Sequence, residues 1–412
     1  MEKITKVLVL IIWISVSLFE ILTYLLINPK PIYWRAWEAV SNYTGKDANL
    51  VPFKPRVVYN GTMTGDLLNA IKFKSLPSEI RKQVFIVDEY GYRNQPGFLK
   101  NKIDAVVFGS SFVGGGQETQ ENLASDLLTN LYKIRTYNFF GIVQTFWEDA
   151  RFLKNKPKYV ILLGQETETI DALYRYSILD RGTINSPKAW NSYESWKKNN
   201  EESIRTYDKF AENLKNYSLT RHYTNVVYID ILNFLLNRAQ IAELTTQDFV
   251  NYDLQSKMLF FQQNYDNPLI NTPGKTETDI QKAIQELLHT KKLLASKDIE
   301  LIVAAMPSKT HIELEKYRNI PDNKSALFIF NQELEKAGIQ YIDLLTPSLE
   351  FARNRGEHLY YPDDSHWNST ANRLAARLLK EKITQIENNK GSKQYWNKDI
   401  EKMESTIQYD IK

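Results

Sequence analysis

The chain has 412 residues, of which 43% are hydrophobic, 25% charged and 12% aromatic, with 16 Gly and 14 Pro. This composition excludes disordered, collagen-like and low-complexity proteins, and the length suffices for one large domain or two ordinary ones. The 52 Lys and Arg residues against 49 Asp and Glu leave a net charge of +3, which is too small for this length to indicate a nucleic-acid partner. The lack of cysteine excludes disulfides, zinc-thiolate sites, iron–sulfur clusters and thiol nucleophiles.

The first long apolar run covers residues 7–27 and contains Glu20 as its one charged residue. At about 1.5 Å per residue a helix of this length spans the roughly 30 Å of a hydrocarbon core, so we expect an uncleaved transmembrane anchor at residues 1–28. The run is longer than the apolar part of a signal peptide, and Asn-Pro-Lys-Pro follows it instead of a small-residue cleavage site. A buried core helix is the less favoured alternative. The short leader favours a cytoplasmic N-terminus, with the rest of the chain on the periplasmic or cell-surface side.

Residues 29–97 show little sustained periodicity and are expected to form a stalk and lead-in that packs on the following domain. Beyond them, apolar runs predict strands at residues 105–108, 136–140, 159–163, 300–305 and 340–345. Helical spacing of apolar residues predicts helices at residues 121–132, 144–156, 276–296, 324–336 and 369–383. Continuous apolar strands that alternate with helices are typical of a parallel sheet covered on both faces. We therefore expect a three-layer, doubly wound α/β domain at residues 98–383.

This α/β pattern is interrupted at about residues 174–273, where Trp190, Trp196 and many Tyr and Asn residues occur. We expect a largely helical insertion over the carboxyl edge of the sheet, where open α/β sheets bind their ligands. Its aromatic side chains would either stack on sugar rings or form the small core of the insertion. Residues 384–412 are expected to form a polar C-terminal tail.

Two short stretches carry the residue types that acyl transfer needs. In residues 106–116 an apolar run leads into Gly109-Ser110-Ser111-Phe112 and a Gly-Gly-Gly sequence, so that a hydroxyl and its own backbone N–H are presented at the end of a strand. Residues 361–368 place Asp363, Asp364 and His366 just before a helix. One carboxylate can orient the imidazole there while the other ring nitrogen faces a hydroxyl, as in a Ser-His-Asp triad.

Each stretch alone also fits a simpler role. The first fits a flexible strand-to-helix loop or a phosphate cradle, although the Gly-Lys-[Ser/Thr] ending of a P-loop is missing. The second fits a helix cap beside a surface histidine. Together, at the ends of the first and last strands of one sheet, they favour a single site. Lys309 is a weaker candidate for binding an anionic sugar, and Glu166 and Glu168 are weaker candidates for glycoside cleavage. The remaining histidines lack metal-ligand spacing, so we expect neither a metal nor another cofactor.

The ordered set of motifs resembles the SGNH/GDSL hydrolase superfamily, in its membrane-anchored branch similar to alginate-type polysaccharide O-acetylation proteins. The first block of the family, Gly-Asp-Ser-Phe, implies that Ser111 is the nucleophile, with Ser110 in place of the usual Asp. Residues 136–141 resemble the second block, which implies that the N–H groups of Ser111 and Gly141 form an oxyanion hole. The last block, residues 364–368, implies His366 as the base and Asp364 as its orienting carboxylate, with Asp363 at the alternative spacing.

The resemblance covers residues 88–173 and 276–383, and it implies a flavodoxin-like sheet. Two departures from the family pattern are visible. The third block, which has an Asn donor in the family, reads Gly-Gln-Glu-Thr here, with Gln165 as the substitute donor. In alginate O-acetylation proteins the Asp-x-His block precedes the serine, whereas here it follows, as in the common hydrolases. The turn Pro307-Ser308-Lys309 also resembles one found after the fourth strand in this branch.

The sequence therefore predicts a membrane-anchored, extracytoplasmic serine enzyme that transfers an acetyl or similar acyl group to a cell-surface or exported polysaccharide through an acyl-Ser111 intermediate. The implied partners are the polysaccharide acceptor and an acyl donor, delivered by a membrane-bound O-acyltransferase. Tethering beside such an assembly would raise the effective concentration of both. Two alternatives stay open. A carbohydrate esterase would pass the acyl group to water, and a non-catalytic polysaccharide-binding or assembly subunit would keep the fold with a degenerate site.

Overall fold

The structure is a computed structural model that describes residues 2–27, 35–40, 52–70, 79–109, 111–140, 155–166, 250–261, 277–318 and 325–409. Its helices are α1 Glu2–Ile27, α2 Ala36–Val40, α3 Asp66–Ala70, α4 Ser111–Gly114, α5 Ala124–Asn130, α11 Glu277–Ala295, α12 Lys309–Arg318, α13 Ala326–Lys336, α14 Leu345–Arg355 and α15 Ser369–Tyr409. Its strands are β1 Val58–Met63, β2 Arg81–Ile86, β3 Ala105–Gly109, β4 Thr136–Phe140, β5 Tyr159–Gln165, β6 Val250–Asp253, β7 Met258–Phe261, β8 Glu300–Met306 and β9 Gln340–Tyr341. These described strands form one five-stranded sheet and two separate two-stranded sheets.

The central sheet has the strand order β4-β3-β5-β8-β9, and all neighbouring strands in it are parallel. In β3 and β5 every residue but the last is buried. A strand buried on both faces needs apolar side chains at consecutive positions, which is why these strands are continuous apolar runs in the sequence. The expected α/β domain with a parallel sheet is confirmed. The bounds of β3, β4, β5 and β8 lie within two residues of the predicted ones.

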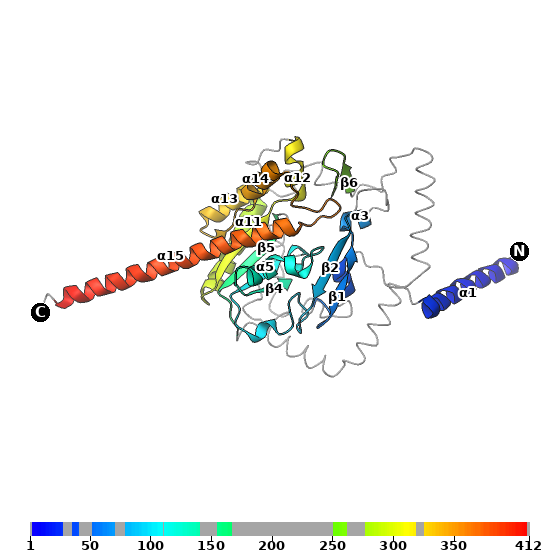
Figure 1. Ribbon diagram of the computed structural model, residues 1–412, viewed down its shortest axis with the longest axis horizontal. Coiled ribbons are helices and arrows are strands. Elements are labelled where there is room, and N and C mark those ends of the chain that lie inside the picture. The colour runs from blue at the N-terminus through cyan, green and yellow to red at the C-terminus, as the bar shows by residue number, and fades with distance from the viewer. Residues whose placement is uncertain are drawn as a thin grey trace.

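The helices cover the sheet in two pairs, because the chain winds outward from β3 in both directions. Right-handed crossovers put α5, which links β3 to β4, on the opposite face from α11 and α13, which follow β5 and β8. α5 packs against α15, and α11 packs against α13 and β8. Figure 1 shows α15 crossing the domain and continuing well beyond it. The winding direction changes between β3 and β5, and ligands of open α/β sheets bind at the carboxyl ends of such strands.

Two elements, β9 and α15, end at other residues than the apolar pattern of the sequence predicts. β9 has only two residues, because the carboxylate of Asp343 accepts hydrogen bonds from the N–H groups of Leu345 and Thr346 and so begins α14. α15 continues to Tyr409, through most of the residues that we expected to form a polar tail. Lys, Glu and Gln favour a helix even without an apolar face to bury. Apolar periodicity therefore shows where a helix packs and not where it ends.

The described parts of the lead-in form a small unit with its own core. β1 and β2 pair as antiparallel strands, and α2 packs against them. The side chains that fill this small core are Ala36, Val40, Phe53, Met63, Phe85 and Val87. The lead-in is thus a folded unit beside the central sheet in Figure 1.

Arg93 joins the lead-in to the segment that follows α4. Its side chain is fully buried, and its guanidinium carbon lies 4.0 Å from the centre of the Phe85 ring. The guanidinium donates hydrogen bonds of 2.5 to 3.2 Å to five acceptors, which are the carbonyl oxygens of Val84, Gly114, Gly115 and Glu118 and the side-chain oxygen of Gln120. One side chain therefore satisfies four backbone carbonyl oxygens at this junction.

The insertion expected at residues 174–273 is described only at residues 250–261, which form the antiparallel hairpin of β6 and β7. The N–H of Leu259 donates a 2.8 Å hydrogen bond to the carbonyl oxygen of Pro362, so the hairpin lies against the turn that carries His366. The expected helical cap with Trp190 and Trp196 lies outside the described residues, and so does nearly all of the helix expected at residues 144–156.

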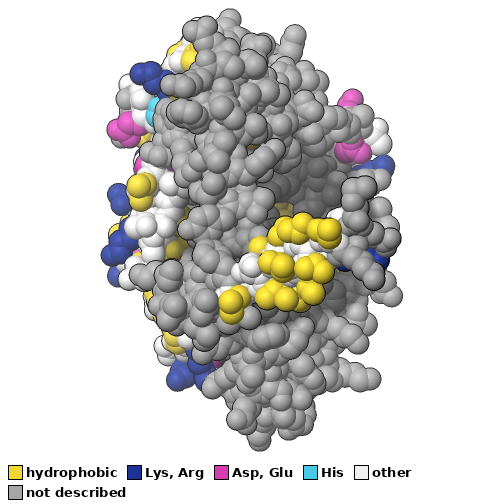
Figure 2. Space-filling view, turned by 90° about the vertical axis from the view of Figure 1, so that its right-hand side faces the viewer, with side chains coloured by type: hydrophobic (Ala, Val, Ile, Leu, Met, Phe, Trp, Pro, Cys, Tyr) yellow, Lys and Arg dark blue, Asp and Glu magenta, His cyan; other side chains and the backbone are white. Residues whose placement is uncertain are grey.

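α1 contains the apolar run from which we expected a membrane anchor. Its large apolar side chains between Ile4 and Leu18 are exposed, and Figure 2 shows them as a patch on this side of the molecule. No helix in the part of the chain that the structure describes combines the length and the hydropathy needed to cross a membrane. The expected transmembrane anchor is therefore not supported by the structure.

Candidate active site

Ser111 is the first residue of α4 and lies just past the carboxyl end of β3. The strand reaches this position through Gly109, where a Cβ atom would lie 2.0 Å from the carbonyl oxygen of Leu163 on β5. Only glycine allows two backbones to pass so closely. The local sequence thus brings the serine hydroxyl to the edge of the sheet at the place where the winding direction changes.

His366 lies in the turn between Tyr360 and α15. Tyr360 and Trp367 pair as an antiparallel bridge, and the Trp367 side chain is buried against the ring of Phe112 from α4. The imidazole itself lies 5.0 Å from the Phe112 ring, measured between ring centres. Aromatic packing therefore fixes the turn against the helix that carries Ser111.

The side chains of Ser111, His366 and Asp364 form a continuous chain of hydrogen bonds. The Nε2 atom of His366 lies 2.8 Å from Oγ of Ser111, and its Nδ1 atom lies 2.7 Å from Oδ1 of Asp364. His366 and Asp364 are both buried. In this geometry the imidazole can take the hydroxyl proton at Nε2 while the carboxylate holds the Nδ1 proton and fixes the tautomer.

Asp364 is held in its ionised form. Burial raises the pKa of its carboxyl, but the charge and hydrogen bond of His366 and the charge of Arg81 outweigh burial and bring the pKa to about 2. Arg81 lies 3.8 Å from Oδ2 of Asp364, which also accepts a 2.6 Å hydrogen bond from the N–H of Asp66. The carboxylate is therefore available to stabilise an imidazolium at any pH near neutrality.

Asp363 faces away from His366, although its spacing in the sequence also fits a triad. Its Oδ1 atom lies 2.6 Å from the guanidinium of Arg81, and its Oδ2 atom accepts hydrogen bonds of 2.9 and 3.0 Å from the N–H groups of Gly65 and Glu79. This residue fastens the turn to the lead-in. Of the two candidate carboxylates, Asp364 is the one in contact with the imidazole.

Lys309, the candidate for an anionic sugar, is buried beneath the same turn. Its ammonium donates hydrogen bonds of 2.6, 3.2 and 2.8 Å to the carbonyl oxygens of Tyr361, Pro362 and Asp364. Burial lowers the pKa of Lys309 to about 8. The ammonium thus holds the backbone of the turn in shape.

Gly116 lies against the imidazole of His366. A Cβ atom at this position would lie 2.9 Å from Nε2 of His366, the nitrogen that faces Ser111. We therefore expect Gly116→Ala to displace the ring and to lower kcat by roughly 10- to 100-fold, with a small effect on stability. Steady-state kinetics with an acetyl ester measures this. Gly356→Ala is a control for glycine replacement away from the site: alanine strains its left-handed backbone (φ 66°), so this variant should lose stability while kcat stays at the wild-type value. Wild-type kcat in Gly116→Ala would contradict the close packing.

Glu118 gives the fold a pH dependence of stability that can be measured. Burial raises the pKa of Glu118 to about 7, and Oε1 accepts a 2.5 Å hydrogen bond from the hydroxyl of Tyr361. The unfolded chain loses this proton near its ordinary value of 4.5 and the folded chain keeps it to about 7, so rising pH in this window lowers the free energy of unfolding by about 3 kcal/mol. Glu118→Gln should lack this decline.

The comparison is made by urea unfolding of Glu118→Gln and wild type at several pH values between 4.5 and 8. Asp88 and Asp126 also have a raised pKa of about 6 because they are buried, so only the difference between variant and wild type isolates Glu118. The exposed Glu121 provides the control variant, Glu121→Gln. Parallel curves for Glu118→Gln and wild type would refute the assignment.

The predicted oxyanion donors are only partly within the described residues. Gly141 and Ser110 lie outside them, as does Glu168. Gln165 is half-buried at the end of β5, next to the buried Glu166, at the same edge of the sheet as Ser111. The role of these groups in holding an oxyanion stays a prediction.

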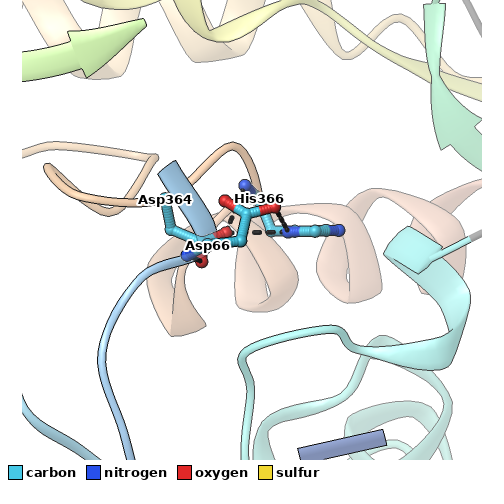
Figure 3. Close-up of side chains that lie close together, drawn as sticks. All are labelled: Asp66, Asp364 and His366. Carbon is cyan, nitrogen blue, oxygen red and sulfur yellow. Dashed lines mark hydrogen bonds and ion pairs between the residues drawn. The ribbon is translucent and has the colours of Figure 1, made fainter. Parts of the chain in front are cut away.

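Asp66, in the lead-in, lies at this site although the sequence did not indicate it. Figure 3 shows its carboxylate beside Asp364 and His366, and one polar atom of each of these three side chains lies within 4.8 Å of those of the others. Asp66 precedes Ser365 by 299 residues, and nothing in its neighbourhood distinguishes it from an ordinary acidic residue in the first turn of a helix. Only the folded chain reveals the contact.

Comparison with known proteins gives a match to a protein family. No curated protein and no solved structure matches the chain significantly. The match is to a family model and covers the part of the chain with Lys309, Asp364 and His366, but not Ser111. Residues 259–405 are similar to the SGNH hydrolase-like domain of the acetyltransferase AlgX, which confirms the resemblance to the SGNH hydrolases over those residues.

Proposed function

We propose that the chain is an O-acyltransferase of the SGNH type that places an acetyl or similar acyl group on a polysaccharide. The observation that carries the proposal is the hydrogen-bond chain from Ser111 through His366 to Asp364 at the carboxyl edge of a parallel sheet. The match of residues 259–405 to an acetyltransferase family supports the same chemistry.

The reaction proceeds in two half-reactions at Ser111. Oγ of Ser111 attacks the acyl carbonyl of the donor, and His366 takes the hydroxyl proton at Nε2 while Asp364 stabilises the imidazolium. The tetrahedral intermediate collapses to acyl-Ser111 as His366 returns the proton to the leaving oxygen of the donor. A sugar hydroxyl then gives its proton to His366, attacks the acyl-serine and leaves as the O-acyl sugar, and the proton returns to Oγ of Ser111.

Backbone and amide donors lower the barrier to both steps by holding the negative charge of the tetrahedral oxygen. The donors assigned to this role are the N–H groups of Ser111 and Gly141 and the side-chain amide of Gln165. Loss of one such donor in serine hydrolases costs about 10² to 10³ in kcat, so these groups decide how fast the proposed enzyme works.

The proposal includes a place of action outside the cytoplasm, on the periplasmic or cell-surface side, where exported polysaccharide is accessible. The acyl donor there is supplied by a membrane-bound O-acyltransferase. The exposed apolar side chains of α1 support association with an apolar partner in this setting.

The test follows the acyl group from donor to product with the full chain. Acetyl donor is added with and without polysaccharide, and Ser111 is examined by mass spectrometry of its peptide. A 42-Da adduct on Ser111, about the mass of one acetyl group replacing hydrogen, and acetylated glycan as product are the expected results. Free acetate at the same rate with and without polysaccharide would indicate an esterase. Glycan binding without any adduct would indicate a binding subunit.

A further inference from the structure

The carboxylate of Asp66 contacts the triad turn from the side opposite to Ser111. Its Oδ1 atom accepts a 2.9 Å hydrogen bond from the N–H of Ser365, and its Oδ2 atom accepts one of 2.9 Å from the hydroxyl of Ser365. The same Oδ2 atom lies 3.8 Å from Nδ1 of His366. Asp66 is buried, so water screens these interactions little.

The backbone of Asp66 acts on the same turn. Its N–H donates a 2.6 Å hydrogen bond to Oδ2 of Asp364, the oxygen that does not contact His366. Asp66 therefore holds both neighbours of the imidazole, Asp364 through its backbone and Ser365 through its side chain. A residue that served only to begin α3 would need neither contact.

Opposing influences act on the carboxylate of Asp66. Its carboxylate accepts two hydrogen bonds from Ser365 and lies 3.1 Å from the guanidinium of Arg35. Burial, and then the nearby charge of Asp364, outweigh these contacts and raise the pKa of Asp66 above its ordinary value. The charge of His366 lowers this pKa, so an imidazole that holds a proton favours the ionised carboxylate. Arg81 beside Asp364, and the Lys309 ammonium on the carbonyl oxygen of Asp364, are further positive charges that face the turn.

On the basis of the proposed function, we propose that Asp66 is a positioning residue of the acyl-transfer site, which fixes the Ser365–His366 turn against Asp364 and places a second negative charge beside His366 when the imidazole holds the proton of Ser111. The lead-in then contributes to the site, because it supplies the carboxylate of Asp66. Charge at this distance stabilises the imidazolium and so strengthens His366 as a base.

Asp66→Asn removes the charge and keeps the hydrogen bonds with Ser365, while the hydrogen bond from Arg35 to Oδ2 is lost. The backbone N–H that holds Asp364 is unchanged, and the amide can accept from the N–H of Ser365 and donate to its hydroxyl. Asp88→Asn is the matched control, because Asp88 is a buried carboxylate of the same lead-in that accepts hydrogen bonds from Tyr92 and Tyr137, away from His366.

The experiment titrates the imidazole of His366 by NMR in the full chain, with its signal identified by its loss in His366→Gln. We expect the titration midpoint to fall by about one unit in Asp66→Asn and to stay unchanged in Asp88→Asn. With an acetyl ester, kcat should fall by roughly tenfold in Asp66→Asn without a change in KM, and the acidic limb of the pH profile should move with the midpoint.

The NMR readout does not depend on turnover, which separates this inference from the proposed function. A lowered midpoint in a chain that transfers no acyl group supports the role of Asp66 and refutes the proposed reaction. An unchanged midpoint in folded Asp66→Asn overturns the role of Asp66, whatever the activity. If Asp66→Asn does not fold, Ser365→Ala, which removes one hydrogen bond to Asp66, should lower kcat about threefold at unchanged KM. Wild-type kcat in that variant would likewise overturn the inference.

Discussion

Ser111→Ala and His366→Ala should each lower the rate of acetyl transfer, and of ester cleavage, by at least about 10⁴-fold. The first removes the atom that carries the acyl group, and the second removes the acceptor for its proton, 2.8 Å away. The double variant should be no slower than either single one, because residues that act as one unit lose their effect together. Release of 4-nitrophenol from 4-nitrophenyl acetate measures all three rates.

Matched controls separate chemistry from folding in this test. Ser348 is a buried serine of α14, and His289 is an exposed histidine of α11, both outside the site. Ser348→Ala and His289→Ala should keep the wild-type rate. Wild-type turnover in Ser111→Ala would show that another group carries the acyl chain and would end the case for this triad.

Replacement of Arg93 by Met should lower the free energy of unfolding by about 3 to 5 kcal/mol, the largest effect on stability that we expect. The substitution leaves the buried acceptors of Arg93 without their donor, in a place that water does not reach. Met keeps much of the side-chain volume, so the loss comes mainly from unpaired carbonyl groups and not from a cavity.

Urea unfolding near pH 7 measures this difference. Arg135→Met is the matched control, since the Arg135 side chain donates one hydrogen bond, of 2.6 Å, to the carbonyl oxygen of Phe98 and lies over the Phe98 ring. We expect this control to cost less than about 1.5 kcal/mol. A loss below 1 kcal/mol in Arg93→Met would mean that other groups or water satisfy these carbonyls.

Much of the central sheet could be predicted from the sequence, because a buried strand is recognisable from its own run of apolar residues. A strand covered on both faces, such as β5, is apolar at nearly every position and is bounded by polar or small residues. The contact between Ser111, His366 and Asp364 could be anticipated for a related reason. Ser111 lies two residues after such a strand, and Asp364 and His366 are two positions apart, so each motif can be recognised without knowledge of distant parts of the chain.

The supporting contacts could not be predicted, because they join residues without any common pattern. Asp66 and Arg81 contact the turn that carries Asp363 and Asp364, roughly 300 residues further along the chain. Nothing in the sequence around a charged residue of the lead-in indicates which distant residue it will contact. The choice between Asp363 and Asp364 could not be made for the same reason. Both spacings suit a triad, and only the contacts of Asp363 with Arg81 and with backbone N–H groups of the lead-in show that this carboxylate faces away from the imidazole. The sequence around Lys309 also does not show whether its side chain is buried or exposed to solvent.

The long sequence separations at the site also say when it can form during folding. Ser111 and His366 are 255 residues apart, and Asp66 and Asp364 are 298 apart. Closing loops of this size costs entropy that only the packed sheet and helices repay, so these contacts form after most of the core. During synthesis, every nascent chain that has not yet reached residue 366 contains Ser111 without the partner of its hydroxyl. The hydrogen-bond chain from Ser111 to Asp364 is thus completed at the last stage of folding, when the surrounding fold already limits access to Ser111.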